Sequence, residues 1–141
     1  MKKNIFYCFF FVSCATEGFY IKNSYDIILY KQISTQELAH SSKTMPVNNY
    51  LIIDLRAQSL YQKEHINNAI SLPYNNIKSI VNISNIYHSQ IIFYDTKNIY
   101  DFTIINIMKK LNITNFNFLQ DGFSKWTNEN RPTSSSTNNY I

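Results

Sequence analysis

The chain has 141 residues, the size of one ordinary domain, and a formal net charge of +4 at pH 7. Hydrophobic residues make up 45% and aromatic residues 16%, which is enough for a core and excludes a wholly disordered chain. The basic residues are scattered along the domain, apart from one Lys-Lys pair at 109–110 near the end of an expected helix, where cations are favoured. This distribution argues against a nucleic-acid-binding surface.

The first residues have the pattern of an export signal. Residues 1–3, Met-Lys-Lys, precede an apolar run over 5–12 that is too short to span a bilayer comfortably. Residues 11–14, Phe-Val-Ser-Cys, resemble the lipobox of bacterial lipoproteins, with Phe in place of the usual Leu. The sequence predicts a leader over 1–14, a lipidation candidate at Cys14, and an exported protein that is secreted or anchored in a membrane through this leader alone. A cleaved signal peptide without lipid and an uncleaved anchor are the alternatives.

Composition divides the rest of the chain into three parts. We expect a linker over 15–24, one domain over 25–132, and a Ser/Thr/Asn-rich flexible tail over 133–141. The two cysteines, Cys8 and Cys14, lie in the leader, so the expected domain contains no disulfide.

The first half of the domain contains a βαβ pattern. A strand over 25–33 leads to Ser34, which with Glu37 three residues later predicts a capping box and a helix to about residue 42. The apolar run 51–53, closed by Asp54, predicts a buried strand. A short helix follows, with Leu60 and Tyr61 as its apolar face, and then a second strand over 69–72. A strand, a helix and a strand so close together imply a parallel sheet covered by helices.

The second half repeats the alternation. A short helix is expected around 77–81, a strand over 90–94, a helix over 100–111, a strand over 116–119 and a last helix over 123–130. The helix over 100–111 carries an apolar stripe that we assign to the core, and Trp126 is expected to pack the last helix onto the sheet. The predicted fold class is α/β: a small parallel sheet of about five strands with helices on both faces.

Two motifs carry a family resemblance. Residues 54–56, Asp-Leu-Arg, and residues 61–69, Tyr-x3-His-Ile-x2-Ala, resemble the first signature of rhodanese-like domains. The chain departs from that signature with Asn at 67 and 68, where the family usually has Pro and Gly. Residues 119–126 resemble the second signature, a closing strand, a turn at Gly122 and a last helix with Trp126. Two signatures in order, about one domain apart, predict a rhodanese-like fold.

The resemblance implies a place for the chemistry and raises a difficulty there. In rhodanese-like enzymes the loop after the strand equivalent to 90–94 carries a nucleophilic Cys and curls into a cradle of N–H groups for an anion. Here this loop consists of Asp95, Thr96, Lys97, Asn98, Ile99, Tyr100 and Asp101. Asp95 stands at the position of the Cys, and a carboxylate cannot relay sulfane sulfur as a thiolate does. Two carboxylates also repel an anionic substrate.

We therefore expect no catalytic residue. The favoured hypothesis is an inactive binding or interaction module that contacts a protein partner or small ligand at Asp95, Lys97 and Asp101. Asp95 or Asp101 is further expected to cap the helix that follows. A sulfurtransferase with weak or partner-assisted activity is the first alternative.

The second alternative is a metal or small-ligand site on a rim of carboxylates from Asp54, Asp95 and Asp121. Against it, Asp54 and Arg56 are expected to form a structural pair, and His65 to be a structural histidine. We expect no metal and no cofactor. A phosphatase is excluded by the same missing Cys, because that chemistry on this fold needs a Cys and an Arg in the loop.

Overall fold

The structure, a computed structural model, describes residues 19–23, 26–44, 46, 49–83, 90–97 and 102–136. The expected leader, with Cys14, lies outside these residues, as do loop residues 98–101. The elements in chain order are β1 Phe19–Asn23, β2 Asp26–Ile33, α1 Thr35–Thr44, β3 Tyr50–Asp54, α2 Gln58–Lys63, β4 His65–Ile66, β5 Ala69–Ser71, the 3₁₀-helix η2 Tyr74–Asn82, β6 Gln90–Tyr94, α3 Phe102–Lys110, β7 Phe116–Leu119, α4 Gly122–Asn128 and β8 Thr133–Ser134.

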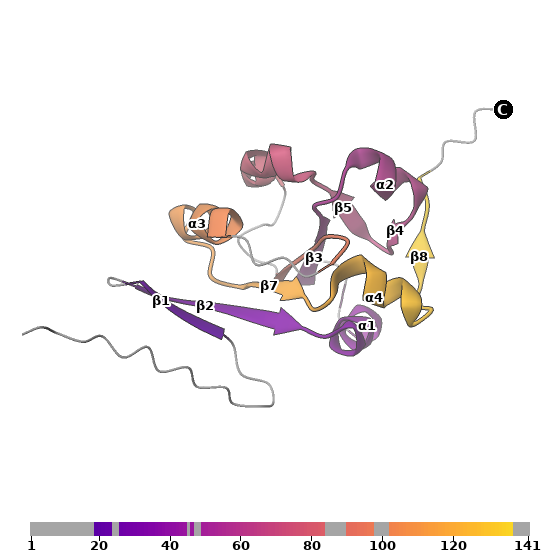
Figure 1. Ribbon diagram of the computed structural model, residues 1–141, viewed down its shortest axis with the longest axis horizontal. Helices are drawn as coiled ribbons and strands as arrows, with labels where there is room; N and C mark the ends of the chain where they lie inside the picture. Colours follow the sequence, from indigo (N-terminus) through magenta and orange to yellow (C-terminus); the bar gives the residue numbers. More distant parts are fainter. Residues whose placement is uncertain are drawn as a thin grey trace, which may run out of the picture.

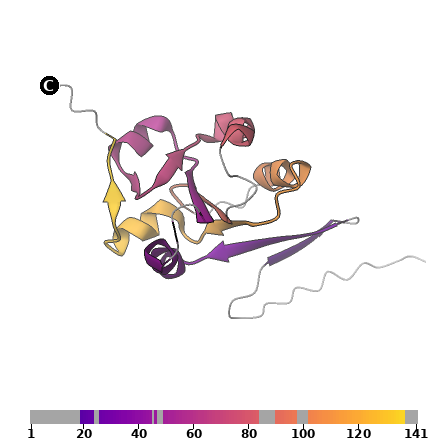
Figure 2. The ribbon, with the colours of Figure 1, turned by 180° about the vertical axis from the view of Figure 1, so that it is seen from behind.

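The central sheet has six strands in the order β1-β2-β7-β6-β3-β5. The five strands from β2 to β5 in this order run parallel, which confirms the α/β class and the predicted parallel sheet. β1 pairs antiparallel with β2, and the two strands extend from one end of the sheet (Figures 1 and 2). The expected linker over 15–24 is thus wrong for residues 19–23, because these residues pair with β2 through main-chain hydrogen bonds.

Each face of the sheet packs against its own set of helices, because side chains alternate between the two faces of a strand. Ile53, Ile91 and Phe93 point to the face covered by η2 and α3, whereas Ile52 and Ile92 point to the face covered by α1 and α4. Figure 1 shows α3 and η2 on one side of the sheet and α1 and α4 on the other. Burying a side chain of this size contributes about 1.5–3 kcal/mol. Both faces of the sheet contain such side chains, so both layers of the core stabilise the fold.

The helices follow the predicted apolar patterns with one exception. In α3, Ile104, Ile105 and Met108 are buried, as the stripe predicted. In α2, Tyr61 packs against the core, but Leu60 is 44% exposed. The expected Leu60–Tyr61 apolar face is therefore wrong for Leu60. Adjacent residues point about 100° apart around a helix, so α2 does not turn both side chains toward the core. None of the residues of α2 is fully buried.

The last described residues of the chain pack beside the α2–β4 segment. β8 pairs antiparallel with β4 in a separate two-stranded sheet, and the main-chain N–H of Ser136 donates to Gln62. The Thr133 hydroxyl donates to the Glu64 carboxylate, and the Trp126 indole N–H donates to the Pro132 carbonyl oxygen. The expected flexible tail over 133–141 is therefore wrong for residues 133–136, which these hydrogen bonds attach to the α2–β4 segment.

No helix in the described part of the chain is both long enough and apolar enough to cross a membrane.

The predicted capping box begins α1. The Glu37 main-chain N–H donates to the Ser34 hydroxyl oxygen at 3.1 Å, while the Ser34 N–H donates back to the Glu37 carboxylate at 2.8 Å. Each residue satisfies an N–H that the first helical turn leaves without a partner. The hydrogen bonds from the Ser34 N–H and hydroxyl lower the pKa of Glu37 below its ordinary value of 4.5.

We expect Ser34→Ala to lower the free energy of unfolding by about 0.5–2 kcal/mol at pH 7, measured by urea denaturation. Because the pKa of Glu37 is lowered on folding, its stabilising contribution is present above the unfolded pKa and is lost as pH falls through the folded pKa. The stability difference between wild type and Glu37→Gln should therefore shrink below about pH 4. Ser59→Ala, at an exposed position inside α2, is the control and should cost nothing. An equal loss in both serine variants would contradict the capping assignment.

Candidate functional site

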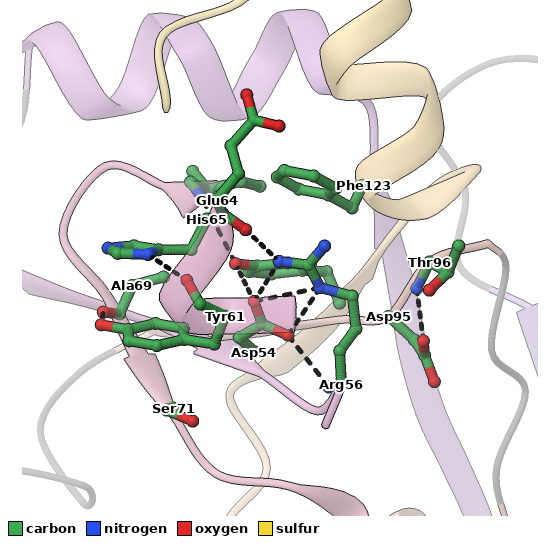
Figure 3. A network of polar contacts seen from close by, with 12 residues as sticks. Asp54, Arg56, Tyr61, Glu64, His65, Ala69, Ser71, Asp95, Thr96 and Phe123 are labelled. Atoms are coloured by element: carbon green, nitrogen blue, oxygen red, sulfur yellow. Dashed lines mark hydrogen bonds and ion pairs between the residues drawn. The ribbon is translucent and has the colours of Figure 1, made fainter. Parts of the chain in front are cut away.

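A buried ion pair lies at the carboxyl end of β3. The Asp54 side chain is fully buried, and Arg56 is 6% exposed. The Arg56 guanidinium donates to both carboxylate oxygens of Asp54, with Nη2 at 2.7 Å, and the Arg56 main-chain N–H donates to the same carboxylate at 2.9 Å (Figure 3). This geometry is the structural pair expected of Asp54 and Arg56. Such a pair is stable in a core because its charges meet and its hydrogen bonds are made.

Tyr94, the last residue of β6, completes the Asp54 environment. Its hydroxyl donates to the Asp54 carboxylate at 2.6 Å and accepts the main-chain N–H of Ile66 at 3.2 Å. Burial raises the pKa of Tyr94, and the negative charge of Asp54 raises it further, so the hydroxyl remains a donor. The hydrogen bonds join β3, β6 and β4 at one point.

Arg56 is enclosed by groups from two further elements. A second bond from Nη2 reaches the main-chain oxygen of Glu64 at 2.7 Å, at the end of α2. The guanidinium carbon lies 3.7 Å from the ring centroid of Phe123, in α4, which is a cation–π contact (Figure 3). Burial lowers the pKa of Arg56, but hydrogen bonds and charge from Asp54 outweigh this effect, and the net shift is upward. The cation therefore connects α2 and α4 to the sheet.

The loop after β6 lies directly against the start of α4. The main-chain N–H of Phe123 donates to the Asp95 carbonyl oxygen at 2.7 Å, and that of Ser124 donates to the Thr96 carbonyl oxygen at 2.9 Å. Gly122, with φ +61°, makes this approach possible, since a Cβ there would lie 2.5 Å from the Asp95 carbonyl oxygen. Loop carbonyls thus accept N–H groups that would otherwise be open donors in the first turn of α4.

Asp95 uses its side chain within the loop. One carboxylate oxygen accepts the main-chain N–H of Thr96, and the residue is half-buried. Capping of α3 by Asp95 or Asp101 stays a prediction, because Asn98, Ile99, Tyr100 and Asp101 lie outside the described residues. Among the expected binding residues, Lys97 lines a cavity of about 510 Å³. We call this the loop cavity; its lining residues are Lys97, Asp121, Ser124, Lys125 and Asn128.

The three carboxylates proposed for a metal rim have separate surroundings. Asp54 is bound by Arg56 and Tyr94, Asp95 accepts from Thr96, and Asp121 forms an ion pair of 3.0 Å with Lys125. Over residues 19–136, as far as the structure describes them, no three His, Cys, Asp or Glu side chains lie close enough together to hold a metal ion.

The other motif residues have packing roles. His65 is buried, its Nδ1 lies 2.7 Å from the Tyr61 carbonyl oxygen, and its ring stacks on that of Tyr61 at 3.9 Å. Trp126 is 2% exposed and packs α4 onto the sheet. Asn68, where the first signature usually has Gly, adopts φ +63°, the left-handed conformation that Asn tolerates better than most residues.

Sequence reasoning missed Tyr94 and Phe123. Both were placed in the correct elements, but neither was connected with Asp54 or Arg56. Strand alternation contains a signal for Tyr94, since it puts this hydroxyl on the same face as Ile92 at the end of a strand beside Asp54. Phe123 gives no such signal, because its ring meets Arg56 only once α4 has packed.

Comparison with known proteins gives a consistent result. The sequence matches the family described as Rhodanese-like domain over residues 34–129. A protein of Buchnera aphidicola subsp. Schizaphis graminum, described only as uncharacterized, is 30% identical in an alignment of 128 residues; the match covers 82% of this chain and 85% of that protein. Another, from Buchnera aphidicola subsp. Baizongia pistaciae, is 32% identical over 87 residues; the match spans 59% of each protein.

Two solved structures show the same fold. The rhodanese-like domain of an Anabaena sp. protein superposes with a TM-score of 0.65 at 18% identity, over 80% of this chain and 85% of that one. A thiosulfate sulfurtransferase from Pseudomonas aeruginosa superposes with a TM-score of 0.64 at 15% identity, over 77% of this chain but 21% of that one. At these identities the likeness concerns the fold alone.

We expect Arg56→Met to lower the free energy of unfolding by about 3–5 kcal/mol, because Asp54 keeps a buried charge without its cation. Arg131→Met is the control, since its ion pair with Glu129 lies near the surface and should contribute much less to stability. Urea denaturation between pH 4 and 8 measures both, and a loss of similar size in the two variants would contradict the buried-pair assignment.

Gly122→Ala tests the contact between the loop and α4. The new Cβ would clash with two loop carbonyl oxygens, at 2.5 and 2.6 Å, and would also strain the positive φ. We expect Gly122→Ala to destabilise the protein by more than about 2 kcal/mol, because the clash adds to the backbone strain. Asn130→Ala, at φ +52° on the exposed surface, isolates the strain and should cost about 1 kcal/mol. Equal losses in thermal or urea unfolding would show that the loop does not press on α4.

Proposed function

The chain belongs to the rhodanese-like domain family, and on this premise we propose that it is a non-catalytic binding module rather than a sulfurtransferase. Its binding surface is the loop after β6 with the adjoining loop cavity. Its ligand is a partner protein or a small molecule that contacts this surface. The fold is retained, whereas the group that performs the family's sulfur transfer is replaced.

The observation that carries the proposal is the side chain at the end of β6. Sulfur transfer by the family's mechanism needs a thiolate that attacks the sulfane sulfur and holds it as a persulfide. Asp95 occupies that position, and both cysteines of the chain, Cys8 and Cys14, precede the domain. The Asp95 carboxylate instead accepts the main-chain N–H of Thr96 within the same loop.

The hydrogen bonding of the loop supports the same proposal. An anionic substrate is held in such loops by main-chain N–H groups and positive potential. In this chain the N–H groups of Phe123 and Ser124 donate to loop carbonyls, and that of Thr96 donates to Asp95. The Thr96 N–H of the loop is therefore occupied without a ligand, so an anion bound there would have to displace the Asp95 carboxylate.

The loop cavity is the part of this surface that a ligand can contact. Two lysines, Lys97 and Lys125, line it together with Asp121, and Lys125 is paired with that aspartate. Lys97 therefore supplies the cationic contact of the site, next to the loop backbone. A partner with an acidic or hydrogen-bonding segment would complement this surface.

Export completes the proposal. The basic and apolar residues of 1–14 support a signal segment, and Cys14 is a candidate for lipid attachment. The domain then acts outside the cytoplasm, free or held at a membrane surface by this leader.

The test is sulfur transfer from thiosulfate to cyanide, measured as thiocyanate formation on the full-length protein. We expect wild type and the thiol-free variant Cys8→Ser/Cys14→Ser to give only the uncatalysed rate. Asp95→Cys is the comparator, because it adds a thiol at the same position, and a gain confined to it would identify the missing thiol as the cause. Catalytic turnover by the thiol-free variant would refute the proposal.

A further inference from the structure

A second and larger cavity lies beside α1, lined by residues from elements other than the loop after β6. It has a volume of about 610 Å³, which falls within the range of small-molecule sites. We call it the α1 cavity; α1, the strands β2, β6 and β7, and the segment after α4 contribute its walls, among them Lys31, Glu37, Lys43, Gln90, Asn117 and Arg131. It shares no lining residue with the loop cavity.

The floor of this cavity is polar, although it belongs to the central sheet. Asn117 is 5% exposed in the middle of β7, where an apolar residue would pack without the cost of burying an amide. With the Asn117 amide oriented to match its neighbours, its nitrogen donates to the carbonyl oxygens of Phe116 and Lys31, and its oxygen accepts from the Gln90 side chain. These bonds fix two amide side chains at the base of the cavity, which is a built polar surface and not a packing defect.

The walls carry an excess of positive charge. Among the lining residues, Lys31, Lys43 and Arg131 outnumber the one carboxylate, Glu37, while Glu129, outside the lining, pairs with Arg131. The Glu37 carboxylate already accepts the N–H and hydroxyl of Ser34 in the capping box, so its hydrogen-bonding capacity is directed toward the start of α1. The three cations come from β2, from the end of α1 and from beyond α4.

Arg131 is held in a fixed orientation. Its Nε donates to Glu129 at 2.6 Å, and its guanidinium lies 5.7 Å from the Trp126 ring centroid. Glu129 is itself bound by the Thr35 hydroxyl at 2.6 Å. An arginine fixed in this way loses little side-chain entropy when it meets an anion, and its planar fork suits phosphate and carboxylate groups.

We propose that the α1 cavity binds a small organic anion, one that carries a phosphate or a carboxylate group together with hydrogen-bonding groups. The anionic group meets Lys31, Lys43 and Arg131, and the polar remainder meets the amides of Gln90 and Asn117. This site would operate whether or not the loop after β6 has sulfur-transfer activity.

The experiment is a ¹H–¹⁵N NMR titration of the full-length protein with glycerol 3-phosphate, with succinate, and with neutral glycerol. We expect saturable shifts of the side-chain amide signals of Gln90 and Asn117 with at least one anion and none with glycerol. The anion that saturates identifies the chemical group preferred. Lys31→Gln/Lys43→Gln should weaken this binding about tenfold or more, because charge-assisted bonds are lost.

The matched control is Lys63→Gln/Lys78→Gln, which removes the same charge from exposed positions of α2 and η2. Its affinity should stay within about twofold of wild type, since neither lysine lines the α1 cavity and exposed charges are screened by physiological salt. Circular dichroism confirms that both variants are folded. Absence of saturable shifts with both anions, equal weakening in the two variants, or saturable shifts confined to the Lys97 region would each overturn the proposal.

Discussion

The fully buried carboxylate of Asp54 is the constraint around which this domain is arranged. A charge without solvent must be neutralised and hydrogen-bonded by the protein. Arg56 supplies the opposite charge, Tyr94 supplies a hydroxyl donor, and the ring of Phe123 covers the cation. These groups come from the segment just after β3, from the end of β6 and from α4, so the packing of distant elements is coupled to one electrostatic requirement.

This arrangement lies apart from the loop after β6. The Asp54–Arg56 pair lies one strand away from Asp95, and it stabilises the carboxyl edge of the sheet whatever residue follows β6. The loop carbonyl oxygens of Asp95 and Thr96 accept the main-chain N–H groups of Phe123 and Ser124 at the start of α4.

The sequence predicted the local features of the fold well. The strands at 90–94 and 116–119 agree with the structure residue for residue, because short apolar runs between polar breaks specify buried strands. The capping box of Ser34 and Glu37 was predictable because both partners lie within one helical turn. The family signatures located Asp54 and Arg56 through their fixed spacing.

Features that depend on distant partners escaped prediction. β8 has two residues, Thr133 and Ser134, and becomes a strand only because β4 offers it a free edge. The contact of Phe123 with Arg56 and the α1 cavity have the same origin, since their members are brought together from several elements by the completed fold. Periodicity and spacing describe neighbours along the chain, and none of these groups are neighbours in that sense.

The residues with positive φ determine which substitutions the sharp bends of this chain can accept. The described non-glycine residues with positive φ are Asn68, Asn112, Asp121 and Asn130. In this chain of 141 residues with 2 glycines, asparagine and aspartate occupy these positive-φ bends. Gly122 is different, because a carbonyl group occupies the space of its missing methyl. Asparagine can stand where only the positive φ matters, but at Gly122 the neighbouring carbonyl groups leave no space for a Cβ.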